Sequence, residues 1–519
     1  MPRSPTQSIP PSARDEAPEE HARAEEPAEE RAGSQERLAK MERLREAGVQ
    51  PFRAPPGHER TTIAALLGAH DAGELAQGEH PEWRYELGGR LVSRRAHGKN
   101  AFLDLRDGSG AIQLFVRSDT VGRERYEGIL GLDIGDIVAV EGSLYVTQRG
   151  QLALSVSDYT LLTKSLRPPP ARYHGVEDAG TRHRYRELDL MANERARELL
   201  AVRARTIEAL REWMAERGFT EVETPVLQTL AGGASARPFV THHHALDNDL
   251  SLRISVELYL NRALIGGVEN VYDLGKCFRN EGISYRHSPE FTMLEWLQSY
   301  ADHNDVARFT EEMIAWVAQR VLGTTEVSRG GATLDLGSWR RTTMREAILE
   351  RTGADIMESD RARLIAVLGE HGERVHPDAS WAQAVHRIYS KLVEQQIVHP
   401  TLVFDFPVEL FPITKRHARH PQLAEHFDAV IGGVELVSGD SELTDPVEQR
   451  ERFIAQRAQR GPDEEEAPHP HDEEYVRALE YGLAPSASGG MGVDRLLMIL
   501  TGAETLREVV PFPTMRELK

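Results

Sequence analysis

Two stretches of the chain carry side chains that suit a bound nucleotide. The first spans residues 278–292 and reads FRNEGISYRHSPEFT. Arg279 offers two parallel donors to a phosphate, Glu281 can accept a hydrogen bond from an exocyclic amine, and Phe291 can lie flat on a purine ring. A surface hairpin with exposed ion pairs would use the same residue types, and such pairs contribute little to stability. This stretch by itself leaves both interpretations open.

The second stretch is rich in glycine and ends in an arginine. Residues 488–495 read SGGMGVDR, and the apolar run 496–500 follows them. Glycines let the backbone approach a ligand closely, and Arg495 at the start of a helix is well placed to meet a phosphate or to stack on a base. A glycine run alone is weak support for any site.

Three carboxylates are spaced seven residues apart, at Asp428, Glu435 and Glu442. Hard cations such as Mg²⁺ prefer oxygen ligands of this kind, so the spacing suggests a cation site. Acidic side chains on a solvated surface are the alternative interpretation.

Bulk composition limits the function classes. The chain has 519 residues, a formal charge of −20 and 40% hydrophobic residues, and it contains no apolar run long enough to span a bilayer. Its one cysteine, Cys277, cannot form an internal disulfide, and the first residues show no signal pattern, which together predict a cytoplasmic protein. The acidic charge argues only weakly against nucleic acid as a partner, because basic residues concentrated on one surface can still bind phosphates.

Five β-forming segments lie between residues 85 and 166, separated by turn material such as DGSG at 107–110. They are Tyr85–Ser93, Ala101–Leu105, Ala111–Val116, Ile137–Val146 and Leu152–Leu162. Five short strands at this spacing fit a small barrel of the OB type, which commonly binds single-stranded nucleic acid. A purely structural barrel fits the pattern equally well.

Composition and periodicity divide the rest of the chain. We predict a disordered tail over 1–40, a helical segment over 41–84, a linker over 167–195 and a second domain over 196–519. In the second domain, apolar residues recur at helical spacing from Leu199 to Met214, and Gly218 suits the end of that helix. The strands and helices beyond it do not alternate regularly, which predicts a mixed antiparallel sheet with helices and therefore an α+β multidomain protein.

Three stretches resemble, in order, the motifs of bacterial class II lysyl-tRNA synthetases. Residues 218–225, GFTEVETP, resemble motif 1, residues 278–292 resemble motif 2, and residues 489–495 resemble motif 3. The resemblance extends over essentially everything after residue 40, and it implies an OB-type anticodon barrel joined to a class II catalytic domain. It also implies a homodimer formed through motif 1, with ATP, Mg²⁺, lysine and tRNA as ligands and no membrane partner.

The resemblance assigns roles to individual residues. For ATP it implies the α-phosphate on Arg279, the adenine amino group on Glu281, the outer phosphates near His287, and adenine between Phe291 and Arg495. Arg279, Glu281 and Arg495 would be the catalytic residues. Asp428 and Glu435 would bind Mg²⁺, and Glu257 and Glu442 would bracket lysine, with Gly490 also in the amino-acid pocket. In the barrel, Arg95, Phe102 and Gln113 would read a uridine-rich anticodon.

Departures from the family pattern gather around the amino-acid pocket. Leu297 stands where relatives place a tyrosine that meets the substrate ammonium, Asp440 stands at a usually aromatic position, and Ser438 replaces a frequent asparagine. Two interpretations remain open: drift around two retained carboxylates, or altered specificity toward a lysine isomer or another diamino acid. Arg279, Glu281 and Arg495 would be lost in a non-catalytic paralogue, and all three remain.

Overall fold

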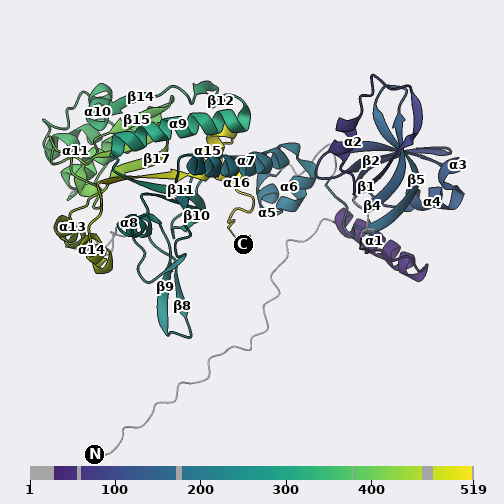
Figure 1. Cartoon of the computed structure of the whole chain (residues 1–519), viewed down its shortest axis with the longest axis horizontal. Coiled ribbons are helices and arrows are strands. Elements are labelled where there is room, and N and C mark those ends of the chain that lie inside the picture. The colour runs from purple at the N-terminus through teal and green to yellow at the C-terminus, as the bar shows by residue number, and fades with distance from the viewer. Residues whose placement is uncertain (1–27, 55–59, 171–177, 377, 459–471, 517–519) are drawn as a thin grey trace, which may run out of the picture. The chain divides into compact units, whose positions relative to one another are not determined.

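The computed structural model describes residues 28–54, 60–170, 178–376, 378–458 and 472–516. The chain separates into two compact units, one formed before residue 178 and the other over residues 178–516 (Figure 1). None of the helices in these described ranges is long and apolar enough to cross a membrane.

The first unit is a closed barrel of five strands in the order β1-β2-β3-β5-β4. Its elements are α1 (Ala28–Glu46), α2 (Ile63–Ala69), β1 (Gly78–His97), β2 (Asn100–Arg106), β3 (Ala111–Arg117), α3 (Ser118–Val121), α4 (Arg123–Gly131), β4 (Ile137–Val146) and β5 (Leu152–Thr163). Alternate residues such as Leu103, Leu114 and Leu154 point inward and form its core. The predicted barrel and its five strands are therefore confirmed.

Two predictions for this unit need correction. Strand β1 begins at Gly78, inside the segment 41–84 predicted to be helical, because its first residues pair with the far end of β4 near Val146. Helix α1 begins at Ala28, inside the tail predicted to be disordered, and residues 1–27 of that tail lie outside the described residues. Both segments have a regular structure because of contacts with distant parts of the chain, which local composition does not reveal.

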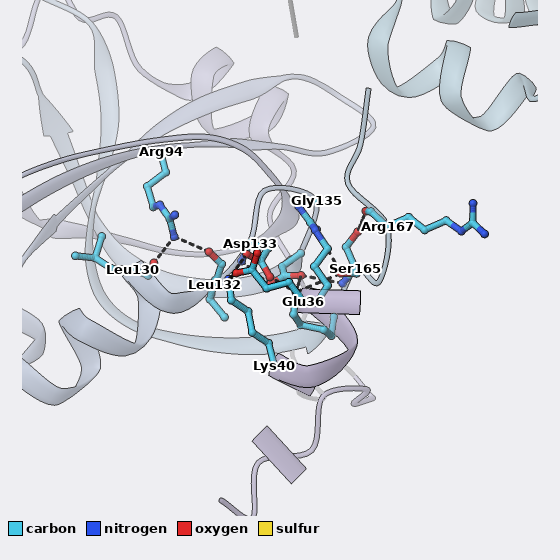
Figure 2. Close-up of polar contacts among 12 residues, drawn as sticks. Glu36, Lys40, Arg94, Leu130, Leu132, Asp133, Gly135, Ser165 and Arg167 are labelled. Carbon is cyan, nitrogen blue, oxygen red and sulfur yellow. Dashed lines mark hydrogen bonds and ion pairs between the residues drawn. The ribbon is translucent and has the colours of Figure 1, made fainter. Parts of the chain in front are cut away.

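A buried charge cluster holds α1 to the barrel (Figure 2). Lys40 of α1 lies 2.6 Å from the carboxylate of Asp133. The buried Lys164 lies 2.8 Å from Asp133 and 2.8 Å from Asp136. Arg37 adds a hydrogen bond of 3.3 Å to the carbonyl oxygen of Ser165. These contacts tie a polar helix to the barrel without a large apolar face.

The second unit is built on an eight-stranded sheet. Its order is β14 (Arg340–Thr343), β15 (Thr401–Phe404), β16 (His426–Ile431), β17 (Val434–Ser441), β18 (Ser486–Gly492), β11 (Glu290–Ser299), β10 (Asn270–Phe278) and β6 (Thr220–Glu221). Only the two outermost pairs are parallel. The predicted mixed antiparallel sheet is confirmed.

One face of this sheet packs against the helices of the main core, and the opposite face carries the site together with a second core cluster that includes Leu297. The helices α7 (Glu194–Glu216), α9 (His303–Leu322) and α15 (Val493–Thr501) share the main core with it (Figure 1). On β11, Leu294 and Trp296 point into that core, so the alternate residues Glu295 and Leu297 point to the opposite face. Gly218 follows α7 with a positive φ of 75°, as expected for a residue that ends a helix.

Residues 178–195, predicted to be part of a linker, belong to the second unit. They form α5 (Ala179–Arg184), α6 (Arg186–Ala192) and the start of α7. The buried Arg186 pairs with Asp189 at 2.9 Å and donates to the carbonyl oxygen of Pro511 at 2.9 Å. Contacts with the distant C-terminal segment, which local sequence cannot show, fix this region.

Smaller elements surround the large sheet. They are β7 (Leu227–Gln228), β8 (Val240–His243), β9 (Asn248–Leu252), α8 (Glu257–Ile265), β12 (Glu326–Arg329), β13 (Ala332–Asp335), α10 (Met344–Thr352), α11 (Arg361–Glu370), α12 (Trp381–Ile388), η1 (Tyr389–Val393), η2 (Glu394–Gln396), η3 (Val408–Leu410), α13 (Pro446–Ala458), α14 (Glu473–Leu479) and α16 (Leu506–Val509). Among them, α8 carries Glu257, a residue predicted to hold the substrate.

Candidate active site

Two rows of residues cross the open face of the large sheet. Strand registers align Glu295, Gly490, Ser438 and Asp428 in one row, and Leu297, Ser488, Asp440 and His426 in the next. Residues opposite one another on neighbouring strands share a face of the sheet. Residues of both rows line a cavity of about 890 Å³. The sheet thus gathers residues from four separate parts of the sequence around one space.

A β-bulge brings Glu435 to the same face. Asp428 pairs with Ser438, and Val430 pairs with Glu435, so three steps along β17 match two steps along β16. The extra residue changes the alternation of β17 and turns Glu435 toward the side that carries Asp428. Both predicted cation ligands line the cavity as a result.

The residues predicted to hold ATP line the same cavity. They are Arg279, Glu281, His287, Phe291 and Arg495. The first three lie on the loop between β10 and β11, Phe291 lies in β11, and Arg495 lies in the first turn of α15. The guanidinium carbon of Arg279 is 5.2 Å from the centroid of the Phe291 ring. Donors for phosphates and a flat apolar surface for a base therefore lie side by side.

Arg495 and His287 each have a charged neighbour in this region. Arg495 donates to the backbone oxygen of Glu435 at 2.6 Å and lies 3.5 Å from its carboxylate. Burial lowers the pKa of His287, and the nearby Arg495 lowers it further. A neutral imidazole at this position can donate to a phosphate from one nitrogen without adding charge.

A buried network of hydrogen bonds and one ion pair connects residues 278–292 with residues 488–495. Asp494 pairs with Arg203 of α7 at 2.6 Å and accepts from the backbone amide of Thr292 at 2.8 Å. Arg203 also donates to the hydroxyl of Thr292 at 2.8 Å. A Cβ atom added to Gly489 would lie 2.2 Å from the Trp296 ring, so only glycine fits there. The network fixes the start of α15 relative to β11.

Two carboxylates interact with each other at the acidic end of the site; Glu257 lines the cavity, whereas Glu442 is not one of its lining residues. Glu257 lies at the start of α8, and the buried Glu442 follows β17 and accepts from the amide of Asn261 at 2.9 Å. Burial raises the pKa of Glu442 to about 7, and burial together with the charge of Glu442 raises the pKa of Glu257 well above its usual value. The pair therefore shares a proton near neutral pH when no cation is bound.

Unpaired polar atoms surround this acid pair. One carboxylate oxygen of Glu257, one of Glu442, the amide oxygen of Asn261 and the hydroxyl of Tyr475 are buried without a hydrogen-bond partner. Such groups cost free energy unless a ligand satisfies them. Of these four residues, Glu257 lines the cavity, and its unpaired oxygen is a pure acceptor that suits a ligand with N–H donors, as an ammonium group has.

Sequence reasoning missed a third carboxylate, Glu295. It is buried, lines the cavity, and accepts from the hydroxyl of Ser255 at 3.0 Å and the amide of Val256 at 2.9 Å. Burial raises its pKa despite these hydrogen bonds. Its position two residues before Leu297 on the same strand face was the only available signal. It could hold a second cationic group of a substrate.

Asp440 already has hydrogen-bond partners within the protein, whereas the interpretation of altered specificity needs its carboxylate to contact the substrate. One of its oxygens accepts from the hydroxyl of Thr414 at 2.6 Å and lies 2.7 Å from His426. Burial would lower the pKa of His426, but Asp440 and Asp428 outweigh burial and raise that pKa to about 10. The carboxylate of Asp440 thus faces an imidazolium of the protein itself. Neither Thr414 nor His426 was identified from the sequence.

Asp428 and Glu435 suit a magnesium ion, which needs few protein ligands, better than a metal that is surrounded entirely by protein ligands. No group of three or more His, Cys, Asp or Glu side chains within the described ranges could hold a metal ion. Magnesium typically uses one or two protein carboxylates and completes its shell with substrate phosphates and water. Two carboxylates beside phosphate-binding arginines match that pattern, so the residues present fit the ion.

The predicted anticodon residues share the outer surface of the barrel. Arg95 pairs with Phe102 across β1 and β2, and Gln113 lies on β3 opposite Asp104 of β2. Phe102 stacks on Phe115 with centroids 4.9 Å apart. The sequence analysis did not identify Phe115, whose place in the strand alternation could have shown it. An outward aromatic pair beside polar groups suits unstacked bases.

Comparison with known proteins places the chain in a family. Residues 178–516 match the family described as tRNA synthetases class II (D, K and N), and residues 85–162 match the OB-fold nucleic acid binding domain. The lysine–tRNA ligase of Moorella thermoacetica is 44% identical over 92% of this chain and 97% of its own length. The lysine–tRNA ligases of Carboxydothermus hydrogenoformans and Bacillus cereus are 42% and 40% identical, each over 92% of this chain and over 97% and 96% of their own lengths.

The chain belongs to the class II lysine–tRNA ligase family. Membership confirms the family resemblance seen in the three motifs and the predicted combination of an OB-type barrel with a class II catalytic domain. Residues of two of these motifs, 278–292 and 489–495, line the cavity described above. Leu297, fully buried in the core cluster that also holds Tyr475, presents no polar atom to that cavity.

Proposed function

We propose that this enzyme activates lysine with ATP and transfers the lysyl group to tRNA. The observation that carries the proposal is one cavity lined by phosphate donors, a base-stacking ring and Glu257, whose acid partner Glu442 is buried next to it. Glu257 and Glu442 suit the side-chain ammonium of lysine, while Glu295 suits the α-ammonium group. Arg279 and Arg495 suit the phosphates of ATP.

In the first step, a carboxylate oxygen of lysine attacks the α-phosphorus of ATP, and the bond to the β-phosphate oxygen breaks. Pyrophosphate leaves with the bonding electron pair. No side chain need act as nucleophile, because the carboxylate already is one. Arg279 would stabilise charge that develops on the α-phosphate, and Phe291 would hold the adenine. Magnesium, held by Asp428 and Glu435, would neutralise phosphate charge when bound.

In the second step, a ribose hydroxyl at the end of tRNA attacks the carbonyl carbon of the adenylate, and AMP leaves while the hydroxyl loses its proton. The barrel would select the tRNA through Arg95, Phe102 and Gln113. The proposal includes a homodimer formed through residues 218–225 and action in the cytoplasm, where tRNA is charged.

The test is ATP–pyrophosphate exchange with a panel of lysine, β-lysine, ornithine and arginine. We expect exchange that depends on lysine and a kcat/KM for lysine at least about tenfold above that for each competitor, because the acid pair matches one chain length best. The relatives described above support lysine. A higher kcat/KM for β-lysine or ornithine would replace lysine in this proposal, and the absence of exchange with every member would refute it.

A further inference from the structure

A buried histidine joins the cation-binding carboxylate to the amino-acid pocket. The side chain of His426 is inaccessible to solvent, with Nε2 3.1 Å from Asp428 and Nδ1 2.7 Å from Asp440. The hydroxyl of Thr414 donates to the same oxygen of Asp440 at 2.6 Å. Both ring nitrogens are thus occupied, each by a carboxylate assigned to a different ligand.

Strand register creates this arrangement. His426 and Asp428 are two residues apart on β16 and share a face, and Asp440 lies directly opposite His426 on β17. Thr414 reaches Asp440 from a segment that pairs with the end of β17 through a bridge to Glu442. Three chain segments therefore converge on one imidazole ring.

Aromatic packing leaves the ring no room to turn. The centroid of the Phe411 ring lies 3.9 Å from that of His426, and Phe406 meets the same imidazole edge-on at 4.6 Å. A rotation that improved one hydrogen bond would weaken the other. The positions of Asp428 and Asp440 are consequently linked through a rigid group.

We propose that His426 is a positioning residue that couples cation binding at Asp428 to the shape of the amino-acid pocket at Asp440. The proposal rests on the cation role of Asp428 proposed above. Its distinctive consequence is that Asp440, which is not a cation ligand in that proposal, influences cation affinity through His426. Residues one shell removed from a metal commonly change its affinity by about 10–100-fold when they are replaced.

The experiment measures Mn²⁺ affinity by electron paramagnetic resonance, with the full-length enzyme and a non-hydrolysable ATP analogue. Lysine affinity is measured separately by calorimetry without a divalent cation. We expect Asp440→Asn to weaken Mn²⁺ binding about 10-fold, and His426→Asn to weaken the binding of both Mn²⁺ and lysine. The double variant should bind Mn²⁺ no more weakly than His426→Asn alone, because Asp440 acts only through His426.

Three further variants make the result decisive. Asp428→Asn should weaken Mn²⁺ binding most, and an unchanged affinity would refute the underlying cation site instead of the coupling. His303→Asn removes another buried histidine of the same unit, one that contacts Ser441, and should leave Mn²⁺ affinity unchanged. If His426→Asn fails to fold, Thr414→Val supplies the test, because loss of its hydroxyl should shift Mn²⁺ affinity in the same direction as Asp440→Asn. An unchanged Mn²⁺ affinity in Asp440→Asn, or additive losses in the double variant, would overturn the coupling.

Discussion

At the scale of single residues, the unusual feature of the site is that two acids, Glu257 and Glu442, lie next to each other. Burial raises the pKa of Glu442, and burial together with the negative charge of Glu442 raises the pKa of Glu257. An enzyme that binds a cation can use such a pair, since the incoming ammonium group replaces a proton. The pair therefore suits a positively charged group, and without a ligand it is partly protonated near neutral pH.

This pair predicts that lysine binding depends on pH. Below pH of about 7 the empty pair holds a proton, which binding of the ammonium group must expel, so affinity should rise as pH increases from 6 to 8. The lysine side chain remains charged throughout this range. Calorimetry at pH 6.5 in buffers of different ionisation enthalpy should detect proton release. Affinity that is flat over this range, with no proton release, would contradict the assignment of the pair.

The sequence pointed to most of the residues that line the cavity, but not to the contacts that hold them in place. The placement of Arg279, Glu281 and Arg495 at one cavity was predictable because each lies in a motif that is contiguous in the chain. His426 was not predictable, because its importance arises from Asp440 on the neighbouring strand and from Thr414 in a separate segment. The β-bulge that turns Glu435 toward Asp428 likewise has no signature in residue type.

At the scale of elements, buried ion pairs connect helices and strands that are far apart in the sequence. Arg203 of α7 and Asp494 of α15 meet Thr292 of β11, so three elements share one buried network. In the barrel, the boundaries of β2 to β5 were predicted within one residue, whereas β1 begins seven residues before the predicted Tyr85. The membership of residues 178–195 in the second unit was missed, because it depends on contacts with the segment near Pro511.

The variant Arg203→Met tests the network. It leaves Asp494 buried without its cation, and we expect a loss of about 3–5 kcal/mol in the free energy of unfolding. The kcat of exchange should also fall, because Arg495 follows Asp494 directly. Denaturant unfolding and exchange kinetics measure the two effects. Arg211→Gln is the matched control, since Arg211 forms an exposed pair with Glu221 and should change stability by less than about 1 kcal/mol.

The barrel offers a second test of a buried charge. Lys164→Met leaves Asp133 and Asp136 facing each other in the interior, so we expect the barrel to lose about 3–5 kcal/mol of stability. Lys40→Met removes a partly exposed partner of Asp133 and should cost less than about 1 kcal/mol. Thermal unfolding of the barrel followed by circular dichroism compares the two variants. Equal effects would show that the cluster is not organised around Lys164.

At the scale of the whole molecule, the two units divide the work of the proposed reaction. Every residue proposed to touch ATP or lysine lies within residues 178–516, and every residue proposed to read the anticodon lies in the barrel. Activation and tRNA selection should therefore respond to different substitutions. The division into an OB-type barrel and a class II domain was predictable from motifs and strand spacing, whereas the boundary at residue 178 was not.

Phe102→Ala tests this division of labour. Loss of a stacking ring costs about 1–3 kcal/mol per base, so the KM for tRNA should rise about 5–150-fold. Lysine-dependent exchange, which needs no tRNA, should stay unchanged. Arg123→Gln on α4, where Arg123 forms an exposed pair with Glu127, should alter neither activity. A fall in exchange with Phe102→Ala, or an unchanged KM for tRNA, would contradict the separation.

One binding measurement tests most directly whether a single cavity holds both lysine and the nucleotide. A non-hydrolysable lysyl-adenylate analogue is titrated by calorimetry into the wild-type enzyme, Glu257→Gln and Arg279→Ala. Removing one partner of a buried charged contact costs about 2–5 kcal/mol, so each variant should bind the analogue at least about 30-fold more weakly than the wild type. The account is contradicted if Glu257→Gln binds the lysyl analogue as tightly as the wild-type enzyme does.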